Sequence, residues 1–240
     1  MVSKSGATLV GAFFSPFVNR VQIAFNLKSV EYDYIEETLS SKSDVLLKSN
    51  PVHKTVPVLV HDDKNICESL VIVQYIDEVW TDNSYCILPS DPYDRAVARF
   101  WAAFVDDKMV PMLKELIVSS EEEEKAAVKG RIGEGLVVLE EAFKKCSEGK
   151  AYFGGDDIGY IDIALGSCLE LIKATEKISG LDLVDEARTP KLVGWAARFQ
   201  SHEAVKNVLP EIGRFVEVLE RIQARARAFP DRSWPYLPPQ

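Results

Sequence analysis

The sequence predicts an α/β plus all-α fold, in which an N-terminal domain with a mixed four-stranded sheet is followed by an all-helical domain. Three observations lead to this fold class. Strand-like and helix-like segments alternate up to Trp80. A polar segment at residues 81–91 has no periodicity and suits a linker. Every strong pattern after it is helical, and 240 residues are enough for two small domains.

The first elements form a strand–helix–strand unit. Residues 7–14 are a short apolar run that is typical of a buried strand. Ser15 and Pro16 suit the N-cap and the first position of a helix, whose apolar stripe continues to Phe25. Residues 30–35 are expected to form the second strand. Because a helix separates the two strands, we expect them to be parallel.

The rest of this domain adds a short helix, a hairpin and a third helix. The pattern predicts a helix over 43–49, a strand at 56–60 and a polar turn at 62–65 that leads to a brief fourth strand. A turn this short joins antiparallel strands. Residues 69–80 are predicted to be helical because their apolar side chains are spaced by three. The predicted order is therefore β-α-β-α-β-β-α.

The second domain shows helical patterns throughout. Apolar residues from 97 to 105 mark one face of a long helix, and Pro111 is expected to kink it because proline lacks a backbone N–H. Residues 121–124 are four glutamates that suit the positive end of the next helix. One apolar stripe over 161–172 predicts a third helix. Further helices are expected at 190–200, 201–208 and 212–228, and four prolines predict an extended tail at 230–240.

Composition disfavours several classes of protein. There are 28 Lys and Arg against 37 Asp and Glu, and the net charge of −9 disfavours nucleic acid or an anionic membrane as a partner. Residues 1–8 lack the apolar core of a secretory signal, and no apolar run approaches the ~20 residues of a membrane span. The four cysteines and three histidines show no zinc-like spacing, so we expect no metal site, reduced thiols and a cytoplasmic location.

Polar motifs lie where loops meet helices or strands, and each also has an ordinary structural explanation. Ser15 is suited to hold an anion beside the free amides of a helix start, or simply to cap that helix. The Val56-Pro57 bond is either cis or trans, and trans is by far the commoner form. Glu68 and Ser69 suit an ammonium and a carboxylate, or only the start of a helix.

A further polar motif surrounds the second predicted helix. Its members are Lys42, Asn50, Lys54 and Thr55, which suit a second carboxylate, although solvated lysines are the commoner explanation of such residues. The sequence contains no P-loop, no G-x-G-x-x-G motif and no G-x-S-x-G motif.

Considered as a set, these motifs resemble those of the glutathione S-transferases, and most closely those of the plant tau class. The resemblance extends to about residue 228. The segments that carry it are Ser15-Pro16-Phe17, Asn50-Pro51-Val52-His53-Lys54, Val56-Pro57-Val58-Leu59, Glu68-Ser69, Tyr75-Ile76-Asp77-Glu78, Arg99-Phe100-Trp101, Tyr152-Phe153-Gly154-Gly155-Asp156 and Gly159-Tyr160-Ile161-Asp162. It implies a thioredoxin-like, glutathione-binding domain at 1–83 and a linker at 84–91. An all-helical domain at 92–240, with its tail at 230–240, would complete a hydrophobic acceptor pocket.

The resemblance also implies an activity. The enzyme would conjugate the glutathione thiolate to hydrophobic electrophiles, as in xenobiotic detoxification, and would reduce organic hydroperoxides with glutathione as a second activity. Glutathione would be a co-substrate, with no cofactor. The alternative on the same fold is a carrier that binds hydrophobic ligands without turnover. Thiol–disulfide exchange is disfavoured, because the related classes that perform it have cysteine where this chain has Ser15.

The family's functional positions can be matched to residues of this chain. Ser15 would be catalytic, its hydroxyl donating to the glutathione sulfur. Pro57 would be the family's cis-proline, which exposes the Val56 backbone to the cysteinyl unit. Glu68 and Ser69 would contact the γ-glutamyl unit. The other implied glutathione-binding residues are Lys42, at the glycine carboxylate, Lys54, Thr55 and Asp106. The implied acceptor pocket consists of Phe13, Val110, Lys114, Ile117, Leu171 and Val218, with ordinary core packing as the alternative.

The resemblance further implies a homodimer, with Glu78, Arg95 and Arg99 on the helices that meet at the two-fold axis. The alternative is that these charges pair only within one chain.

The chain departs from the family pattern at three places. Phe13 and Phe14 stand where the family has Trp-Pro. Thr55 stands where a second lysine is common, which removes a charged contact worth about 1.5–3 kcal/mol if that lysine binds a carboxylate. Gly159 stands at a helix N-cap where related classes have Ser or Thr, while Asp162 keeps the carboxylate at the third helical position. We expect this capping motif to serve folding and not catalysis.

Overall fold

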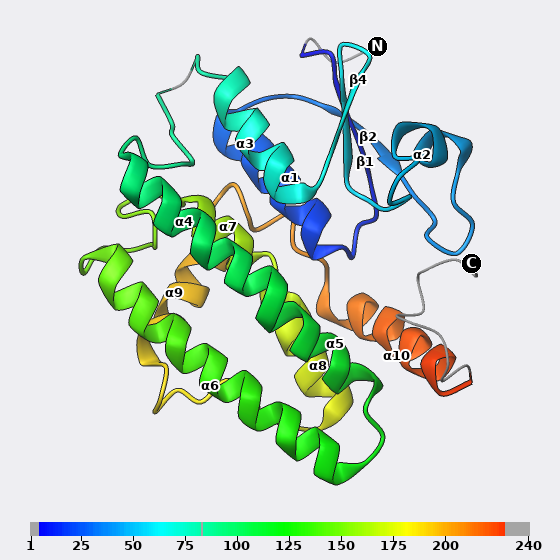
Figure 1. The fold of residues 1–240 in the computed structure, drawn as a ribbon, viewed down its shortest axis with the longest axis vertical. Coiled ribbons are helices and arrows are strands. Elements are labelled where there is room, and N and C mark those ends of the chain that lie inside the picture. The colour runs from blue at the N-terminus through cyan, green and yellow to red at the C-terminus, as the bar shows by residue number, and fades with distance from the viewer. Residues whose placement is uncertain (1–4, 83, 229–240) are drawn as a thin grey trace.

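The N-terminal part of the molecule follows the predicted order of elements. The computed structural model describes residues 5–82 and 84–228 (Figure 1). This part contains β1 (Ala7–Gly11), α1 (Pro16–Lys28), β2 (Asp33–Glu36), α2 (Asp44–Ser49), β3 (Val58–His61), β4 (Lys64–Cys67) and α3 (Ser69–Val79). The fold class is confirmed, with strand ends that differ by a few residues from those predicted.

The sheet is mixed and has the strand order β2-β1-β3-β4. Strand β1 is parallel to β2 and antiparallel to β3, and β3 pairs antiparallel with β4. Helices α1 and α3 pack together and cover one face, and α2 lies on the other (Figure 1). Successive side chains of a strand point to opposite faces of the sheet, so both faces carry apolar residues. Leu9 and Leu59 join the main core on one face, while Val10 and Val58 pack with Leu46 of α2 on the other.

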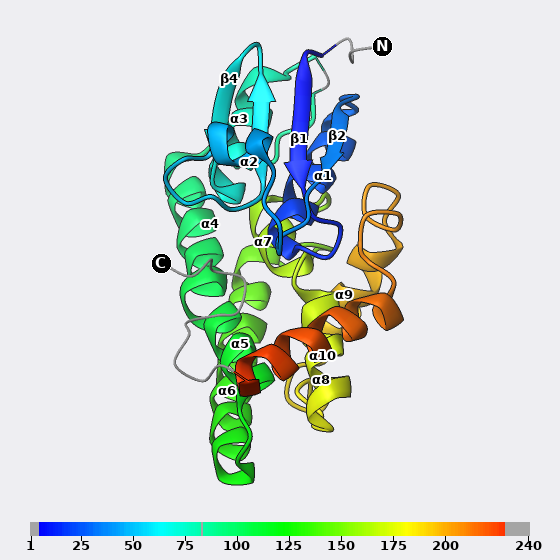
Figure 2. The same ribbon diagram turned by 90° about the vertical axis from the view of Figure 1, so that its right-hand side faces the viewer.

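The second part is helical in all its described elements. It contains α4 (Pro92–Phe104), a π-helical turn η1 (Val105–Met109), α5 (Val110–Val118), α6 (Glu122–Ser147), α7 (Tyr160–Gly166), α8 (Leu169–Ser179), α9 (Pro190–Ser201) and α10 (Ile212–Ala228). Helix α5 packs on α6, and α10 packs on α8 and α5. Figure 2 shows α10 crossing the molecule below the sheet, next to α8.

The kink predicted at Pro111 takes the form of the π-helical turn that precedes it. The Val110 amide donates to the carbonyl of Val105, five residues earlier, in place of the usual four. Pro111 then lies in the first turn of α5, where a missing N–H costs little. The chain thus resolves the conflict between a long helix and an internal proline by beginning a new helix.

The predicted helix over 161–172 is wrong in one respect, because two helices replace it. The carbonyl of Ala164 accepts from Arg20 Nη2 at 2.9 Å and from Ser167 Oγ at 3.1 Å. The Cys168 amide bonds instead to the carbonyl of Leu165, three residues back. The side chain of Arg20, on α1, therefore separates α7 from α8.

The predicted helix at 201–208 is also wrong, since Ser201 ends α9 and residues 202–208 form a bend and successive turns. His202 has an extended backbone, with φ −67° and ψ 139°, and its Nδ1 accepts from the Ala204 amide at 3.1 Å. This side-chain bond competes with helical bonding. The prediction of an extended tail at 230–240 lies outside the described residues.

A loop before α7 is organised around the buried carboxylate of Asp162. Its Oδ1 accepts from the Phe153 amide at 2.8 Å and from Trp195 Nε1 at 2.7 Å, and its Oδ2 accepts from the amides of Gly154 at 2.9 Å and Gly159 at 2.8 Å. Burial raises the pKa of Asp162 to about 6, against the opposing effect of these four donors. Asp162 thereby joins the loop to α7 and α9.

The glycine at the cap position of α7 has a steric cause. A Cβ atom on residue 159 would lie 2.8 Å from the Cα of Gly154, which is backbone and cannot move aside. Serine or threonine would clash in this arrangement, so Asp162 alone supplies the side-chain half of the helix cap.

The segment that follows α3 is held to the N-terminal part of the molecule through Asp77 of α3. The carboxylate accepts from the Ile87 amide at 2.9 Å and the Leu88 amide at 3.0 Å, and Lys28 Nζ lies 3.1 Å from it. Across residues 5–82 and 84–228, no helix combines the length and apolar character needed to cross a bilayer.

Candidate functional site

A cavity of about 360 Å³ opens between the two parts of the molecule. Its walls come from α1, the segment between β2 and α2, the loop before β3, and the start of α3 on one side, and from η1, α5, α8 and α10 on the other. The lining includes Ser15 and every predicted glutathione-binding residue, namely Lys42, Lys54, Thr55, Val56, Pro57, Glu68, Ser69 and Asp106. Segments that are distant in sequence therefore meet around one space.

Ser15 lies at the start of α1 and is 7% exposed. Its Oγ accepts from the Val18 amide at 3.4 Å, so it does cap the helix. A hydroxyl that accepts through its oxygen can still donate its hydrogen, and Ser15 is one of the residues that line the cavity. Capping and anion binding are therefore compatible at this residue.

The loop before β3 is shaped by Asn50. Its side-chain nitrogen donates to the Thr55 carbonyl at 3.0 Å, and its side-chain oxygen accepts from the His53 amide at 3.0 Å. Asn50 is buried and stands behind the loop, so its role is to position Lys54 and Thr55 and not to face a ligand. The Val56-Pro57 peptide bond is cis, as the family resemblance implied.

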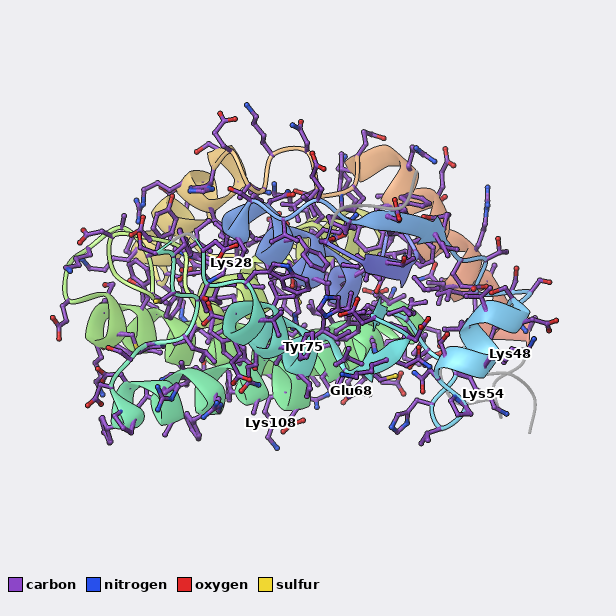
Figure 3. The ribbon with its side chains drawn as sticks, turned by 90° about the horizontal axis from the view of Figure 1, so that it is seen from above. Lys28, Lys48, Lys54, Glu68, Tyr75 and Lys108 are labelled. Atoms are coloured by element: carbon purple, nitrogen blue, oxygen red, sulfur yellow. The ribbon has the colours of Figure 1, made fainter. Side chains whose placement is uncertain are left out.

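Glu68 and Ser69 lie at the start of α3. Glu68 has a φ of +70°, an unusual conformation for a residue with a side chain, and its carboxylate is exposed toward solvent and the cavity. Backbone strain of this kind clusters at ligand sites, where the surrounding structure maintains it. Figure 3 shows Glu68 and Lys54 along the same edge of the molecule. His53 Nε2 lies 3.9 Å from the Glu68 carboxylate.

Lys42 provides a half-buried cation beside this edge. Its Nζ is buried and has no hydrogen-bond partner within the described residues. Burial first, and the positive charge of Lys54 second, lower the pKa of Lys42, while Glu37 opposes the shift. An ammonium group without a partner is costly in such a position, so the arrangement favours an anionic ligand.

The residue that joins the two sides of the cavity is Arg20, which the sequence patterns did not single out. It is fully buried on α1, and its Nη1 and Nη2 bind the two oxygens of Asp106 at 2.9 Å and 2.6 Å. Arg20 Nη1 also donates to Ser69 Oγ at 3.2 Å, and Nε donates to Ser167 Oγ at 3.2 Å. The sequence signal is an arginine between the apolar residues Val18 and Val21 of an amphipathic helix.

This network changes the interpretation of Asp106. Both carboxylate oxygens are already engaged by Arg20, so Asp106 neutralises a buried guanidinium as well as lining the cavity. Burial tends to lower the pKa of Arg20, but Asp106 and Cys168 together outweigh that effect and the pKa is raised. Asp106, Arg20 and Ser69 therefore act as one fixed unit beneath the start of α3.

Of the six residues predicted for the acceptor pocket, three line this cavity and three do not. Val110, Lys114 and Leu171 line it, but Phe13, Ile117 and Val218 do not. The apolar lining further includes Phe14, Phe17, Phe215, Leu219 and Ile222. Helix periodicity on 212–228 could have found the last three, which are spaced by four and three.

The three predicted residues that do not line the cavity each have other packing partners or another orientation. The Phe13 ring lies under the Arg214 guanidinium, 4.6 Å from centroid to carbon, and edge-on to Phe14 at 5.3 Å. Ile117 is fully buried in the core between α5 and its neighbours. Val218 precedes Leu219 and is therefore rotated by about 100° around α10. Phe13 thus supports the cavity wall from behind.

No group of three or more His, Cys, Asp or Glu side chains in the described part of the chain is arranged to hold a metal ion.

Comparison with known proteins agrees with this geometry. Residues 9–83 match the family model described as "Glutathione S-transferase, N-terminal domain", and residues 100–203 match "Glutathione S-transferase, C-terminal domain". Glutathione S-transferase U16 of Arabidopsis thaliana is 51% identical over 97% of this chain and 100% of the relative. The probable glutathione S-transferase GSTU6 of Oryza sativa subsp. japonica is 49% identical over 88% of this chain and 91% of the relative.

Solved structures give the same result. The tau class glutathione S-transferase MiGSTU from mango, Mangifera indica, superposes with a TM-score of 0.88 at 52% identity, covering 91% of this chain and 99% of that one. Rice OsGSTU1 in complex with glutathione superposes with a TM-score of 0.83 at 32% identity, covering 91% and 96%. These matches span both parts of the fold and the cavity between them. The chain therefore belongs to the glutathione S-transferase family, within its tau class.

Proposed function

We propose that this glutathione transferase is of the serine type, with Ser15 as its catalytic residue. The glutathione thiol would lie at Ser15, whose hydroxyl donates to the sulfur and favours the thiolate. The start of α1 adds the positive end of a helix dipole beside the same atom. The serine forms no covalent intermediate in this scheme, so its contribution is the electrostatic activation of a bound nucleophile.

The polar lining complements glutathione along its length. Glutathione carries an ammonium and a carboxylate on its γ-glutamyl unit, a thiol in the middle and a carboxylate on its glycine. Glu68 suits the ammonium, and Ser69 at the start of α3 suits the neighbouring carboxylate. Lys42, with Lys54, suits the glycine carboxylate. The observation that carries this proposal is the buried, unpartnered Lys42 Nζ.

The remaining lining would receive the second substrate. Phe14, Phe17, Leu171 and the three α10 side chains present an apolar surface next to Ser15. A hydrophobic electrophile placed there would be attacked by the thiolate, with formation of a carbon–sulfur bond and loss of its leaving group. Organic hydroperoxides are proposed as further substrates.

The predicted division into domains also remains a proposal. We assign glutathione binding to 1–83, the connection to 84–91 and the acceptor side to 92–240. The structure's four cysteines are free thiols, which supports a cytoplasmic location.

Replacing Lys42 by Met should weaken glutathione binding. The glycine carboxylate would lose a charge-assisted hydrogen bond, and we expect Kd to rise roughly ten- to a hundredfold. Calorimetric titration measures this directly. Lys48→Met is the matched control, because Lys48 is an exposed lysine on α2 that does not line the cavity (Figure 3).

The monoethyl ester of glutathione on its glycine carboxylate makes this test specific. The wild-type protein should bind the ester about as weakly as Lys42→Met binds glutathione, and Lys42→Met should bind the two ligands alike. An equal loss of affinity for glutathione and its ester in Lys42→Met would show that Lys42 does not contact the glycine carboxylate.

We also propose that the protein is a homodimer, formed through α3 and α4. An exposed apolar stripe follows α4 at Tyr93, Ala96 and Phe100, and Tyr93 and Phe100 are 75% and 62% exposed. Val71 on α3 is 51% exposed. Two-fold association of such a stripe with its own copy would remove it from water.

The charged residues at this surface are partly engaged within the chain. Arg99 Nε donates to Gln74 Oε1 at 2.9 Å, and Arg95 donates to the carbonyls of Pro89 and Ser90. Within the described residues, no ion pair joins Glu78 to either arginine. The apolar stripe, more than these charges, therefore supports the dimer.

Sedimentation at micromolar concentration should give about twice the 26.8 kDa of one chain. Phe100→Glu should shift the protein to the monomer, because two buried charges would oppose association at the axis. Val138→Glu, which changes an exposed valine on α6, should leave the dimer intact. A monomeric wild-type protein would contradict the proposal.

A further inference from the structure

A lysine lies at the otherwise apolar acceptor end of the cavity. Lys114 is on α5, one helical turn after Val110, and both line the cavity. Its Nζ is 5.7 Å from the centroid of the Phe17 ring, and Phe17 is two residues after Ser15. The cation therefore lies over the first turn of the helix that carries the proposed catalytic serine.

The surroundings of this lysine are apolar on several sides. Leu171 of α8 and the α10 residues Phe215, Leu219 and Ile222 line the same end of the cavity. Burial lowers the pKa of Lys114, while Asp106 and Cys168 oppose the shift. A cation in a partly desolvated apolar pocket gains more from an anion than it would in water, since the local dielectric is low.

The other charges of the cavity have roles that do not extend to the acceptor. Both oxygens of Asp106 bind Arg20, and Glu68 and Lys42 lie in the part assigned to glutathione. Among the described lining residues, Lys114 is thus the cation that an acceptor in the apolar end would meet, with the Asp106 carboxylate as an opposing charge in the same cavity.

We propose that Lys114 sets the choice of acceptor, so that the enzyme selects hydrophobic electrophiles that carry an anionic group, a carboxylate in the simplest case, over neutral ones. The inference rests on the proposed function, because it concerns the second substrate of the same reaction. The apolar residues would hold the body of the acceptor, and Lys114 Nζ would donate to its carboxylate.

A matched pair of acceptors tests this preference. In 4-chloro-3,5-dinitrobenzoate, the glutathione thiolate forms a carbon–sulfur bond at the chlorinated carbon, and chloride leaves with the electron pair of the broken bond. The thiol proton passes to solvent, and the carboxylate is unchanged. The methyl ester of the same acid undergoes the same reaction without the charge. Each enzymatic rate is compared with its own uncatalysed rate, because the ester is the more activated ring.

Wild-type enzyme should show a higher corrected kcat/KM for the benzoate than for its ester. Lys114→Met should lower the benzoate-to-ester ratio roughly tenfold or more, as expected for the loss of one charge-assisted contact. Lys114→Arg should retain most of the preference. Lys108→Met is the control, because Lys108 is an exposed lysine on η1 that points away from the body of the molecule (Figure 3).

The outcomes separate this inference from the proposed function. A wild-type enzyme that converts neither acceptor contradicts the serine-type transferase itself. A wild-type enzyme that converts both, with a ratio that Lys114→Met leaves unchanged, overturns the role of Lys114 alone. An equal loss of rate on both acceptors, with a raised pKa of the bound thiol, would also overturn it, since Lys114 would then act on the sulfur.

Discussion

Replacing Ser15 by Ala should abolish most of the conjugation rate at neutral pH while glutathione remains bound. A free thiol has a pKa near 8.5, so only about 3% is thiolate at pH 7. We expect the hydroxyl donor and the helix start together to lower the pKa of the bound thiol by about two units. Roughly three quarters of the bound thiol would then be thiolate at pH 7. This shift requires the site to stabilise the thiolate over the thiol by about 2.7 kcal/mol. Loss of the whole effect would lower kcat roughly 25-fold at pH 7, which is the upper limit for Ser15→Ala because the helix start remains.

The pH dependence makes this prediction specific. In the wild-type enzyme, kcat should rise to a plateau with an apparent pKa of about 6.5, and in Ser15→Ala the rise should move toward 8.5. The two rates should therefore approach each other near pH 9. Ultraviolet absorbance of the bound thiolate gives the same pKa without turnover.

Helix capping must be separated from this role, because Ser15 Oγ also accepts from the Val18 amide. Asp91 caps α4 through the amides of Tyr93 and Asp94 and does not line the cavity. Asp91→Ala should cost about 1 kcal/mol of stability and leave the pH profile of kcat unchanged. If Ser15→Ala behaves in the same way, Ser15 is only a cap.

The second large effect is expected in folding, at Asp162. Asp162→Ala would leave three backbone amides and the Trp195 Nε1 group without their acceptor inside the protein. Each unsatisfied buried donor costs about 1–3 kcal/mol, so we expect a loss of at least about 4 kcal/mol in the free energy of unfolding. For a chain of this size, that corresponds to a fall in Tm of roughly 8–16 °C.

The control for this variant is Asp157→Ala, an exposed carboxylate in the same loop, which should change stability by no more than about 0.5 kcal/mol. If Asp162→Ala is recovered only as aggregate, Asp162→Asn provides a measurable intermediate, since its carbonyl oxygen retains part of the network while its amide group opposes the other donors. Thermal unfolding of Asp162→Asn that matches the wild-type protein would contradict the structural role.

Local signals predicted most of the fold. Ser15 and Pro16 begin α1, and α10 spans Ile212–Ala228 as its periodicity indicates. The errors arise where a distant residue decides the local hydrogen bonds. The break between α7 and α8 depends on Arg20, which donates to the Ala164 carbonyl across 144 positions of sequence. No window of neighbouring residues contains that information.

The candidate site shows the same limit. Taken one at a time, Ser15 and Ser69 are ordinary helix-start residues, and only the similarity to a family assigned them a common ligand. The polar lining of the cavity was predictable because its residues lie in short motifs next to strands and helices. The acceptor side was less predictable, since Phe14 and Phe13 are neighbours in sequence and only packing against Arg214 decides which one faces the cavity.

The π-helical turn has a consequence for how this chain tolerates changes in length. Regular α-helix advances by about 100° per residue, so eight residues would leave Asp106 and Lys114 about 80° apart around the axis. The turn accommodates one extra residue and brings them to within roughly 20°, so both face the cavity. The π-helical turn is thus equivalent to a one-residue insertion in a regular helix. Removing a residue at exposed Asp107 would keep Lys114 in phase but would place Pro111 inside regular helix, at a cost of about 3 kcal/mol. Adding a residue would instead rotate Lys114 away from the acceptor.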